Sequence, residues 1–183
     1  MKVEKTFIPG LLVIEPDFFP DNRGFFFESF NREKYAAHGI EMEFIQDNLS
    51  KSTKNTVRGL HYQAGEHAQG KLCQVITGNV LDVAVDIRFG SPTFGKHFSV
   101  ELSGDNHKQI WIPPGFAHGF SVLTDEAIFS YKCTAKYDKP SERSIIYNDP
   151  VLGIEWMVET PIVSDKDLKA KIFAEIKKEF FFT

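Results

Sequence analysis

The chain has 183 residues, 42% of them hydrophobic and 25% charged, and its formal net charge is −4. A chain of this length forms one ordinary domain whose core needs no disulfides or structural metal, which excludes the small secreted folds that depend on them. The slightly acidic balance excludes nucleic-acid binding through a basic face, and no apolar run approaches the ~20 residues that cross a bilayer. We expect a single domain over residues 1–183 with no nucleic-acid or membrane partner.

The two cysteines and the N-terminus indicate where the protein works. Cys73 and Cys133 lie far apart without a CxxC pair, which argues against a redox motif or a zinc knuckle. The first five residues carry mixed charge, unlike a secretory signal. Both observations predict a reducing, cytoplasmic setting.

Short apolar segments separated by Gly, Pro, Asn and Asp run through most of the chain, which is the pattern of an all-β sandwich or barrel. Residues 11–14 are the first expected strand, ended by Pro16, and residues 24–30 the second, with phenylalanines on both faces. Asn31 is a candidate cap for a short helix through His38, which Gly39 would close in the left-handed conformation.

The strand pattern is densest between residues 57 and 131. The expected strands there cover residues 72–76, 80–87, 97–102, 109–112, 119–123 and 127–133. Along residues 80–88 the alternation predicts one core face and one polar face, the latter carrying Asp82 and Asp86. We assign no role to these two carboxylates.

Only the C-terminal region has a helical pattern. Ser164 is a good N-cap, and Leu168, Ile172 and Ile176 follow at helical spacing. We therefore expect a C-terminal helix, followed by a Phe180–Phe182 tail that packs on a partner subunit or frays.

Residues 113–118, PPGFAH, match the PxGxxH half of the cupin pattern. In metal-dependent cupins an earlier strand resembles HxH followed by Glu, which together supply metal ligands. Here that strand reads His61-Tyr62-Gln63, so Gln63 stands where the second histidine is required. We predict a site without metal.

The motifs FxDxRGxFxExF, QDNxS, RGLHYQ, SPTFG, IPPGFAHGF, YK, NDPxLGIxW and SxKD follow one another from about Phe19 to Asp167. In this order the chain resembles the dTDP-4-dehydrorhamnose 3,5-epimerase family of deoxysugar nucleotide biosynthesis. The resemblance implies a cupin-type jelly roll, a homodimer with exchanged N-terminal strands, a dTDP-4-keto-6-deoxy sugar as substrate and no cofactor.

The resemblance also implies roles for individual residues. His61 matches the family's general base, and Asp167 matches the carboxylate that orients it. Tyr131 matches the proton donor on the opposite face of the sugar, and Lys71 the cation beside the C4 carbonyl. The residues that match nucleotide-sugar contacts are Phe19, Arg23, Phe26, Glu28, Gln46, Asn48, Arg58, His118, Glu142 and Lys166.

Elementary chemistry agrees with these roles. Removal of a proton from C3 or C5 of a 4-keto sugar places negative charge on the ketone oxygen, which Lys71 could stabilise. An unperturbed imidazole changes charge near ambient pH, so a histidine such as His61 suits a general base. We expect nearby cations to lower the pKa of the Tyr131 phenol so that it can return a proton, and the planar forks of Arg58 and Arg23 to bind the diphosphate.

Several of these residues also have a simpler structural explanation. Asp167 could be a favourable carboxylate in a first helical turn, and His118 could bond to backbone after the Pro-Gly turn. Tyr131 alone on a strand is more often a core residue. Arg23 and Lys71, each beside a glycine, could be solvated turn residues.

Other functions remain open at this point. A mono-epimerase or a 3,4-ketoisomerase acting on a related dTDP sugar would use the same base and acid, and Ala135-Lys136-Tyr137 departs from the usual family pattern where such branches differ. A metal-dependent cupin oxygenase is disfavoured by Gln63, and a binding module without catalysis by the set of His61, Asp167 and Tyr131.

Overall fold

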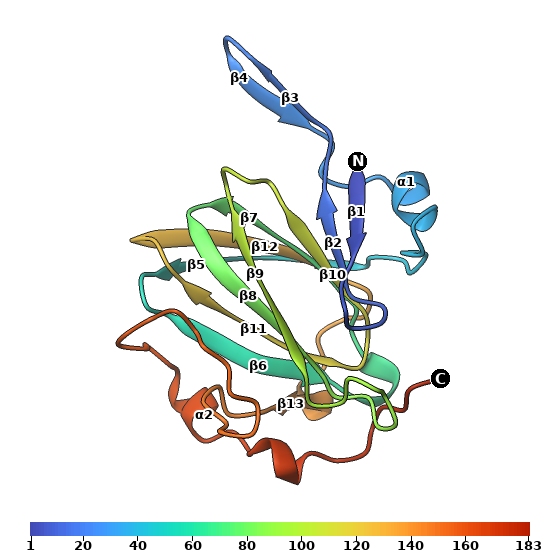
Figure 1. Ribbon diagram of the computed structural model, residues 1–183, viewed down its shortest axis with the longest axis vertical. Helices are drawn as coiled ribbons and strands as arrows, with labels where there is room; N and C mark the ends of the chain where they lie inside the picture. The colour runs from blue at the N-terminus through green and yellow to red at the C-terminus, as the bar shows by residue number, and fades with distance from the viewer.

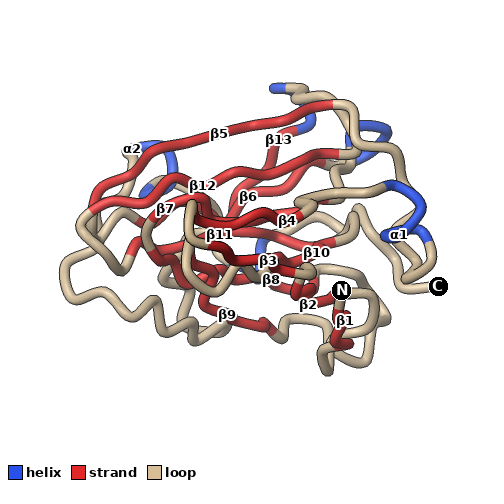
Figure 2. The backbone as a smooth tube through the Cα atoms, turned by 90° about the horizontal axis from the view of Figure 1, so that it is seen from above, coloured by secondary structure: helices blue, strands red, loops and turns tan.

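Two antiparallel sheets packed face to face make up most of the protein, whose computed structural model describes residues 1–183 (Figures 1 and 2). The six-stranded sheet has the order β1 (Lys2–Lys5), β2 (Leu12–Glu15), β10 (Gln109–Ile112), β7 (Lys71–Thr77), β12 (Glu126–Cys133) and β5 (Gln46–Thr53). The five-stranded sheet has the order β13 (Glu142–Ser144), β6 (Val57–Gln63), β11 (Phe116–Val122), β8 (Asn79–Asp86) and β9 (His97–Ser103). The expected all-β, cupin-type sandwich is confirmed, and the sheets do not close into a barrel.

The main core lies between the two sheets. Fourteen buried residues fill it, including Val75 and Phe129 from the six-stranded sheet and Ala84 and Phe120 from the five-stranded one. The rings of Phe120 and Phe129 stack across the gap with centroids 4.3 Å apart. Contact between large apolar groups of opposite sheets is what holds such a sandwich together.

Strand β8 is buried on both faces, which corrects the predicted polar face. Its odd-numbered residues, such as Val83 and Val85, pack against the C-terminal segment, which covers the outer side of this sheet (Figure 1). Its even-numbered residues face the other sheet, and Asp82 and Asp86 are fully buried there. The alternation is as predicted, but the covering layer is not visible in the sequence.

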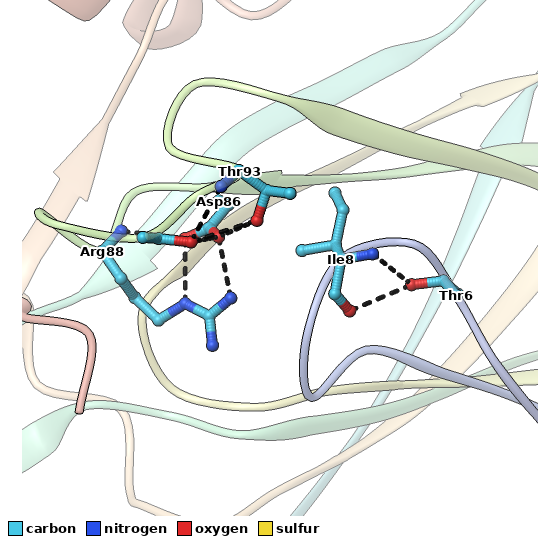
Figure 3. A network of polar contacts seen from close by, with 6 residues as sticks. Thr6, Ile8, Asp86, Arg88 and Thr93 are labelled. Atoms are coloured by element: carbon cyan, nitrogen blue, oxygen red, sulfur yellow. Dashed lines mark hydrogen bonds and ion pairs between the residues drawn. The ribbon is translucent and has the colours of Figure 1, made fainter.

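The buried carboxylate of Asp86 is held by four side-chain hydrogen bonds (Figure 3). Arg88 donates to it through Nε and Nη2 at 2.9 and 2.7 Å, and the hydroxyls of Ser91 and Thr93 donate at 2.6 and 2.7 Å. Burial favours a raised pKa for Asp86, yet these bonds outweigh it and hold that pKa below its usual value. Asp86 is thus a structural anion at the end of β8.

The N-terminal predictions are largely confirmed. Helix α1 spans Arg32–Ala36, the Asn31 side chain caps it by accepting from the Lys34 N–H, and Gly39 has a positive φ. The strand expected over residues 24–30 is shorter, because β4 (Gly24–Phe27) ends opposite Phe18, the first residue of its antiparallel partner β3 (Phe18–Asp21). Together β3 and β4 form a hairpin that projects from the body (Figure 1).

Strand β5 is absent from the strands predicted from the sequence. Its residues QDNLSKST are mostly polar and show no apolar alternation. It forms because its backbone pairs with β12 along eight positions, from Gln46 opposite Cys133 to Thr53 opposite Glu126. An outer strand needs few buried side chains when backbone hydrogen bonds supply its pairing.

The predicted C-terminal helix is wrong beyond its first turn. Helix α2 covers only Asp165–Leu168, and the chain then continues irregularly with a 3₁₀ turn at Phe173–Glu175. The reason is a tertiary pairing, since Lys171 bridges to Ile145 and its carbonyl accepts from the Ile146 N–H at 2.8 Å. Further 3₁₀ turns lie at Gly65–His67 and Lys139–Ser141.

None of the helices has the length and apolar character that crossing a membrane requires.

The phenylalanine tail packs on its own chain rather than fraying. Phe89 donates its N–H to the Phe180 carbonyl at 2.9 Å and accepts from the Phe182 N–H at 3.0 Å. The guanidinium of Arg88 lies over the rings of Phe116 and Phe182, 4.5 and 5.0 Å from their centroids. The tail therefore closes the end of the sandwich beside Asp86.

Gly59 allows β6 and β11 to approach closely beside the candidate site. Its φ is +128°, and a Cβ there would lie 2.5 Å from Gly119 Cα and 2.8 Å from the His118 carbonyl oxygen. Backbone cannot move aside as a flexible side chain can. We expect Gly59→Ala to lower the free energy of unfolding by about 3 kcal/mol, measured by urea denaturation.

Gly90 provides the matched control for this prediction. It has a positive φ of 84°, but a Cβ added there would meet nothing within 4 Å. Gly90→Ala should therefore lower the free energy of unfolding by only about 1 kcal/mol, the cost of holding alanine at a positive φ. If both variants lower the free energy of unfolding by the same amount, the close approach of the strands is not what requires glycine at position 59.

Candidate active site

A cavity of about 190 Å³ opens between the two sheets. The structure brings together five residues predicted from the sequence, Arg58 and His61 on β6, Lys71 on β7, His118 on β11 and Tyr131 on β12. The other lining residues are Ser50, Gly119, Phe120 and Phe129. His61 and Tyr131 belong to opposite sheets, so a ring bound between the sheets would have one of them on each side.

His61 and Asp167 form a close polar pair at the site. His61 Nε2 lies 2.6 Å from Asp167 Oδ1, although 106 residues separate them in the chain. Asp167 sits in the first turn of α2, where Ser164 Oγ accepts from its N–H at 3.1 Å. Burial alone would raise the pKa of Asp167, but the bonds from His61, the Gly59 N–H and Ser164 together lower it. The carboxylate is therefore ionised and fixes the orientation of the imidazole.

This lowered pKa leads to a pH-dependent stability prediction. A carboxylate whose pKa is lower in the folded state stabilises the protein above the unfolded pKa, near 3.9, and loses that contribution as pH falls through the folded value. Asp167→Asn should lower stability at pH 7, and its difference from the wild type should shrink below about pH 4. Urea denaturation at pH 7, 5 and 3 measures this.

Asp165→Asn is the control, because Asp165 lies in the same helical turn, is exposed and makes no side-chain hydrogen bond. It should change stability little at any of the three pH values. A deficit of the Asp167 variant that persists unchanged at pH 3 would contradict the ionised state of the Asp167 carboxylate at neutral pH.

Tyr131 differs from expectation in its acidity. Burial raises its pKa to about 12, and the weak opposing effect of Arg58 does not compensate. The prediction that cations lower this pKa is therefore wrong. Lys71 Nζ lies 5.9 Å from the Tyr131 ring centroid, above the ring face rather than at the hydroxyl. The phenol is protonated at neutral pH, which is the form a proton donor needs.

His118 lies opposite His61 in the pairing of β11 with β6. Only 7% of its surface is exposed, and its Nε2 lies 2.9 Å from Asp82 Oδ2. Burial lowers the pKa of His118, and Asp82 opposes that effect only in part. The imidazole is therefore a neutral part of the cavity wall, and Asp82, which has no role predicted from the sequence, is its partner.

A second cavity, of about 370 Å³, adjoins the first at Arg58 and His61. Lys166 and Asp167 also line it. Arg58 Nε donates to Ser52 Oγ at 2.9 Å, which leaves the two terminal nitrogens of the guanidinium without protein hydrogen-bond partners. Sequence reasoning misses Ser52, because a serine on a polar strand carries no distinguishing signal.

Glu142, Lys166 and Tyr137 cluster at the rim of the site. Lys166 Nζ lies 2.6 Å from Glu142 Oε1, and the Tyr137 hydroxyl donates to Glu142 Oε2 at 3.1 Å. The Tyr137 ring is 56% exposed. An exposed aromatic ring next to charged groups offers a stacking surface, a feature that position alone in the sequence does not reveal.

Gln46 and Asn48 join this rim to the wall of the cavity. Gln46 Oε1 accepts from the Tyr137 N–H at 2.8 Å, and Gln46 Nε2 donates to Asn48 Oδ1 at 3.0 Å. Asn48 pairs with Tyr131 across β5 and β12. Of the two predicted contact residues, Asn48 therefore lies beside Tyr131, and Gln46 connects it to the rim.

Gln63, which stands at the second histidine position of the cupin pattern, does not face the cavity. Its Nε2 donates to the carbonyls of His67 and Lys136 at 2.7 and 3.0 Å, and its Oε1 accepts from the Asp138 N–H at 2.7 Å. Gln63 thus fastens the loop that carries Tyr137.

A separate cluster of three buried side chains has the residue types and spacing of metal ligands. It consists of Cys73, Asp82 and His118.

Four predicted contact residues lie outside this arrangement. Phe19, Arg23 and Phe26 belong to the projecting hairpin, and Glu28 follows it (Figure 1). Arg23 pairs with Asp21, and Glu28 with Lys34, both at the surface. Phe19 and Phe26 are 59% and 69% exposed. Within one chain these residues do not meet the cavity.

Comparison with known proteins identifies the family. The family model described as dTDP-4-dehydrorhamnose 3,5-epimerase matches residues 5–175. The Shigella flexneri protein of that name is 54% identical, over 96% of this chain and 97% of its own length. The Salmonella typhimurium protein of that name is 52% identical, over 94% and 95%.

A solved structure agrees with the sequence relatives. The dTDP-6-deoxy-D-glucose-3,5-epimerase of Legionella pneumophila, in complex with dTDP-4-keto-L-rhamnose, superposes with a TM-score of 0.96 at 49% identity. The alignment covers 100% of this chain and 98% of that one. The motifs, the two-sheet fold and these relatives lead to one conclusion: the chain belongs to the dTDP-4-dehydrorhamnose 3,5-epimerase family of isomerases.

Proposed function

We propose that the protein inverts C3 and C5 of dTDP-4-dehydro-6-deoxy-D-glucose and so produces dTDP-4-dehydro-L-rhamnose for deoxysugar biosynthesis. The observation that carries the proposal is the cavity in which the His61–Asp167 pair faces Lys71 and Tyr131. The ligand of the Legionella relative, dTDP-4-keto-L-rhamnose, supports the choice of substrate. The reaction is redox-neutral, so it needs no redox cofactor.

His61 is the general base. It removes the proton from C3 or C5, both acidified by the C4 carbonyl, and an imidazole in this role contributes roughly 10²–10⁴-fold. Asp167 orients the ring and stabilises the imidazolium that forms, because its carboxylate lies 2.6 Å from Nε2. The remaining ring nitrogen, Nδ1, is then the atom that takes the proton.

Tyr131 is the proton donor on the opposite side of the ring. After the enolate forms, inversion requires a proton from the face away from His61. Tyr131 comes from the facing sheet and is protonated at neutral pH, since burial raises its pKa to about 12. Before the second inversion, and again before the next turnover, the phenolate takes a proton from solvent and the His61 imidazolium releases its proton to solvent.

Lys71 stabilises the enolate oxygen. Its charge lies in the cavity wall, where low polarity makes it effective on a developing anion. Lys71→Ala should lower kcat by about 10²-fold or more with a smaller change in KM, because the interaction is strongest in the transition state. Steady-state kinetics measure the split, and Lys169→Ala, an exposed lysine, is the control. A change confined to KM would make Lys71 a binding residue.

The nucleotide is held by the second cavity and the rim. Arg58 presents its two terminal nitrogens to the diphosphate, and Lys166 adds a second positive charge. Gln46, Asn48 and Glu142 bind the polar edges of the nucleotide sugar. His118 contributes to the floor on which the sugar rests, since its ring lines the first cavity.

A homodimer completes this site. The hairpin of β3 and β4 exposes Phe19 and Phe26 on an arm that reaches away from its own body, so we propose that it crosses to the partner. There Phe19, Arg23, Phe26 and Glu28 would meet the nucleotide. Light scattering should give twice the chain mass, and Arg23→Ala should raise KM without dissociating the dimer. A monomer with full activity would refute the exchange.

We also propose that the protein works in the cytoplasm. Cys73 and Cys133 are both buried as free thiols. Such thiols persist in a reducing compartment. Fractionation of cells that express the natural protein would test this, and activity in a membrane or extracellular fraction would contradict it.

The decisive experiment follows isotope and configuration together. The protein is incubated with dTDP-4-keto-6-deoxyglucose in D₂O, and deuterium and stereochemistry at C3 and C5 are read by NMR. Deuterium and inversion at both carbons are expected. Inversion at one carbon alone indicates a mono-epimerase, a moved carbonyl indicates a ketoisomerase, and no exchange despite binding indicates a binding module. Each of these three results refutes the proposal.

A further inference from the structure

The arm formed by β3 and β4 has two aromatic faces (Figure 1). Phe18 lies opposite Phe27 and Phe19 opposite Phe26 in the pairing of the two strands, and successive side chains of a strand point to opposite sides. Phe18, Phe25 and Phe27 therefore share one face, and Phe19 and Phe26 share the other. On the first face the ring centroids of Phe18 and Phe25 lie 5.1 Å apart, and those of Phe25 and Phe27 lie 6.1 Å apart.

The first face rests on one ring of the body, that of His107, in the turn that joins β9 to β10. The His107 ring stacks on Phe18 with centroids 4.2 Å apart and planes 19° from parallel. Its centroid lies 4.9 Å from that of Phe25 and 5.3 Å from that of Phe27. Aromatic rings at such distances stabilise one another beyond the area that they bury. His107 therefore holds the whole face against the body.

The arm itself has no polar attachment to the body. The backbone bonds of β3 and β4 pair the two strands with each other, and the Arg23 side chain bonds to Asp21 within the same hairpin. Ion pairs hold only the segments at its base, where Asp17 pairs with the N-terminal amine and Glu28 with Lys34. The direction of the arm beyond its base thus depends on the aromatic contacts.

The turn that carries His107 is braced by its neighbour Asn106. The Asn106 Oδ1 accepts from the backbone N–H groups of Ser103 and Lys108, both at 3.0 Å, and its Nδ2 donates to the Glu101 carbonyl at 2.9 Å. His107 has a φ of +53°, in the left-handed region that few residues other than glycine adopt. Such a conformation persists where the surroundings fix it, so the imidazole is held in one place.

We propose that His107 is a positioning residue for nucleotide binding. With one face of the arm against His107, the other face points away from the body, and Phe19 and Phe26 are 59% and 69% exposed there. His107 thus sets the direction in which these two rings are presented to the nucleotide site of the partner subunit. The proposal rests on the proposed homodimer with exchanged arms. His107 does not line the cavity of His61, so it acts on binding and not on proton transfer.

His107→Asn is the test, because asparagine tolerates the left-handed conformation but has no ring. We expect the Kd for dTDP, measured by calorimetry, to rise about 2–10-fold, the range that loss of one aromatic contact produces. The KM for the nucleotide sugar should rise similarly. The kcat should stay within about two-fold of the wild type, because His61, Lys71 and Tyr131 are unchanged.

Rescue and coupling distinguish the ring contact from a general loss of structure. His107→Phe restores a ring at this position and should return the Kd to near the wild-type value. Phe18→Ala removes the other ring of the stack and should weaken dTDP binding by a similar factor. The double variant His107→Asn, Phe18→Ala should bind no more weakly than either single variant, because both changes break the same contact. His38→Ala, an exposed histidine without contact to the arm, should bind normally.

Circular dichroism and light scattering establish that each variant is folded and has the mass of the wild type. Equal dTDP affinity in the wild type and in folded His107→Asn would overturn the proposal, and so would a loss that His107→Phe fails to restore. If His107→Asn does not fold, Phe18→Ala decides in the same way. The proposed reaction fails separately, since a wild-type protein that binds dTDP without inverting the sugar refutes the epimerase function and leaves the affinity comparison to decide on His107.

Discussion

His61→Ala should abolish deuterium incorporation at both C3 and C5 of the substrate in D₂O. The same imidazole is assigned to both carbons, and the other imidazole of the cavity, His118, is a weaker base because burial lowers its pKa. General base catalysis of this kind is worth roughly 10²–10⁴-fold, so the residual rate should fall below that of the wild type by at least this factor. NMR of the recovered sugar measures it.

Two controls separate this result from loss of structure or of binding. His38→Ala replaces an exposed histidine remote from the cavity and should leave exchange unchanged. The His61 variant should still bind dTDP, because Arg58 and Lys166 remain, and calorimetry would measure that affinity. Normal exchange at either carbon in a folded, dTDP-binding His61→Ala protein would refute His61 as the base for that carbon.

Tyr131→Phe should reduce inversion by roughly 10²–10⁴-fold while deuterium exchange continues. His61 can still remove the proton and return a deuteron to the face from which it came, which labels the sugar without changing its configuration. The Tyr131 side chain lines the cavity, and its hydroxyl makes no hydrogen bond within the protein, so its removal should change stability by less than about 0.5 kcal/mol. The test compares the rate of labelling with the rate of product formation in one sample.

Tyr147→Phe provides the matched control, because Tyr147 lies outside the cavity and is likewise partly buried. It should epimerise at the wild-type rate. If the Tyr131 variant forms product normally, another group returns the proton. If labelling and inversion fall in parallel, Tyr131 acts at or before proton removal.

The local sequence determined the elements whose causes are local. Strand β10 begins and ends at the predicted residues, 109 and 112. Helix α1 begins after Asn31, whose side chain caps it, and ends before Gly39, which adopts the left-handed conformation. The predicted helix beyond Leu168 fails for the opposite reason. Its residues have helical spacing, but Lys171 forms an isolated β-bridge with Ile145, 26 positions earlier in the chain.

The candidate site also contains some residues whose place the sequence predicts and others whose place depends on tertiary or quaternary structure. Motif order by itself identified the family and a residue set of which His61, Lys71 and Tyr131 meet in one cavity. Motif order does not explain the role of the hairpin residues, because in a single chain Phe19 and Phe26 are exposed and do not line that cavity. Their role depends on a partner surface.

Motifs and strand patterns were enough to predict the family, the all-β class and the chemical identity of the groups available for proton transfer. How those groups behave follows from their packing in the fold. Burial raises the pKa of Tyr131 to about 12, against the expected lowering, and the pairing of β8 with β11 turns Asp82 into the partner of His118. Protonation and ligand geometry depend on distance and on exclusion of water, and both arise only when residues far apart in the chain are packed together.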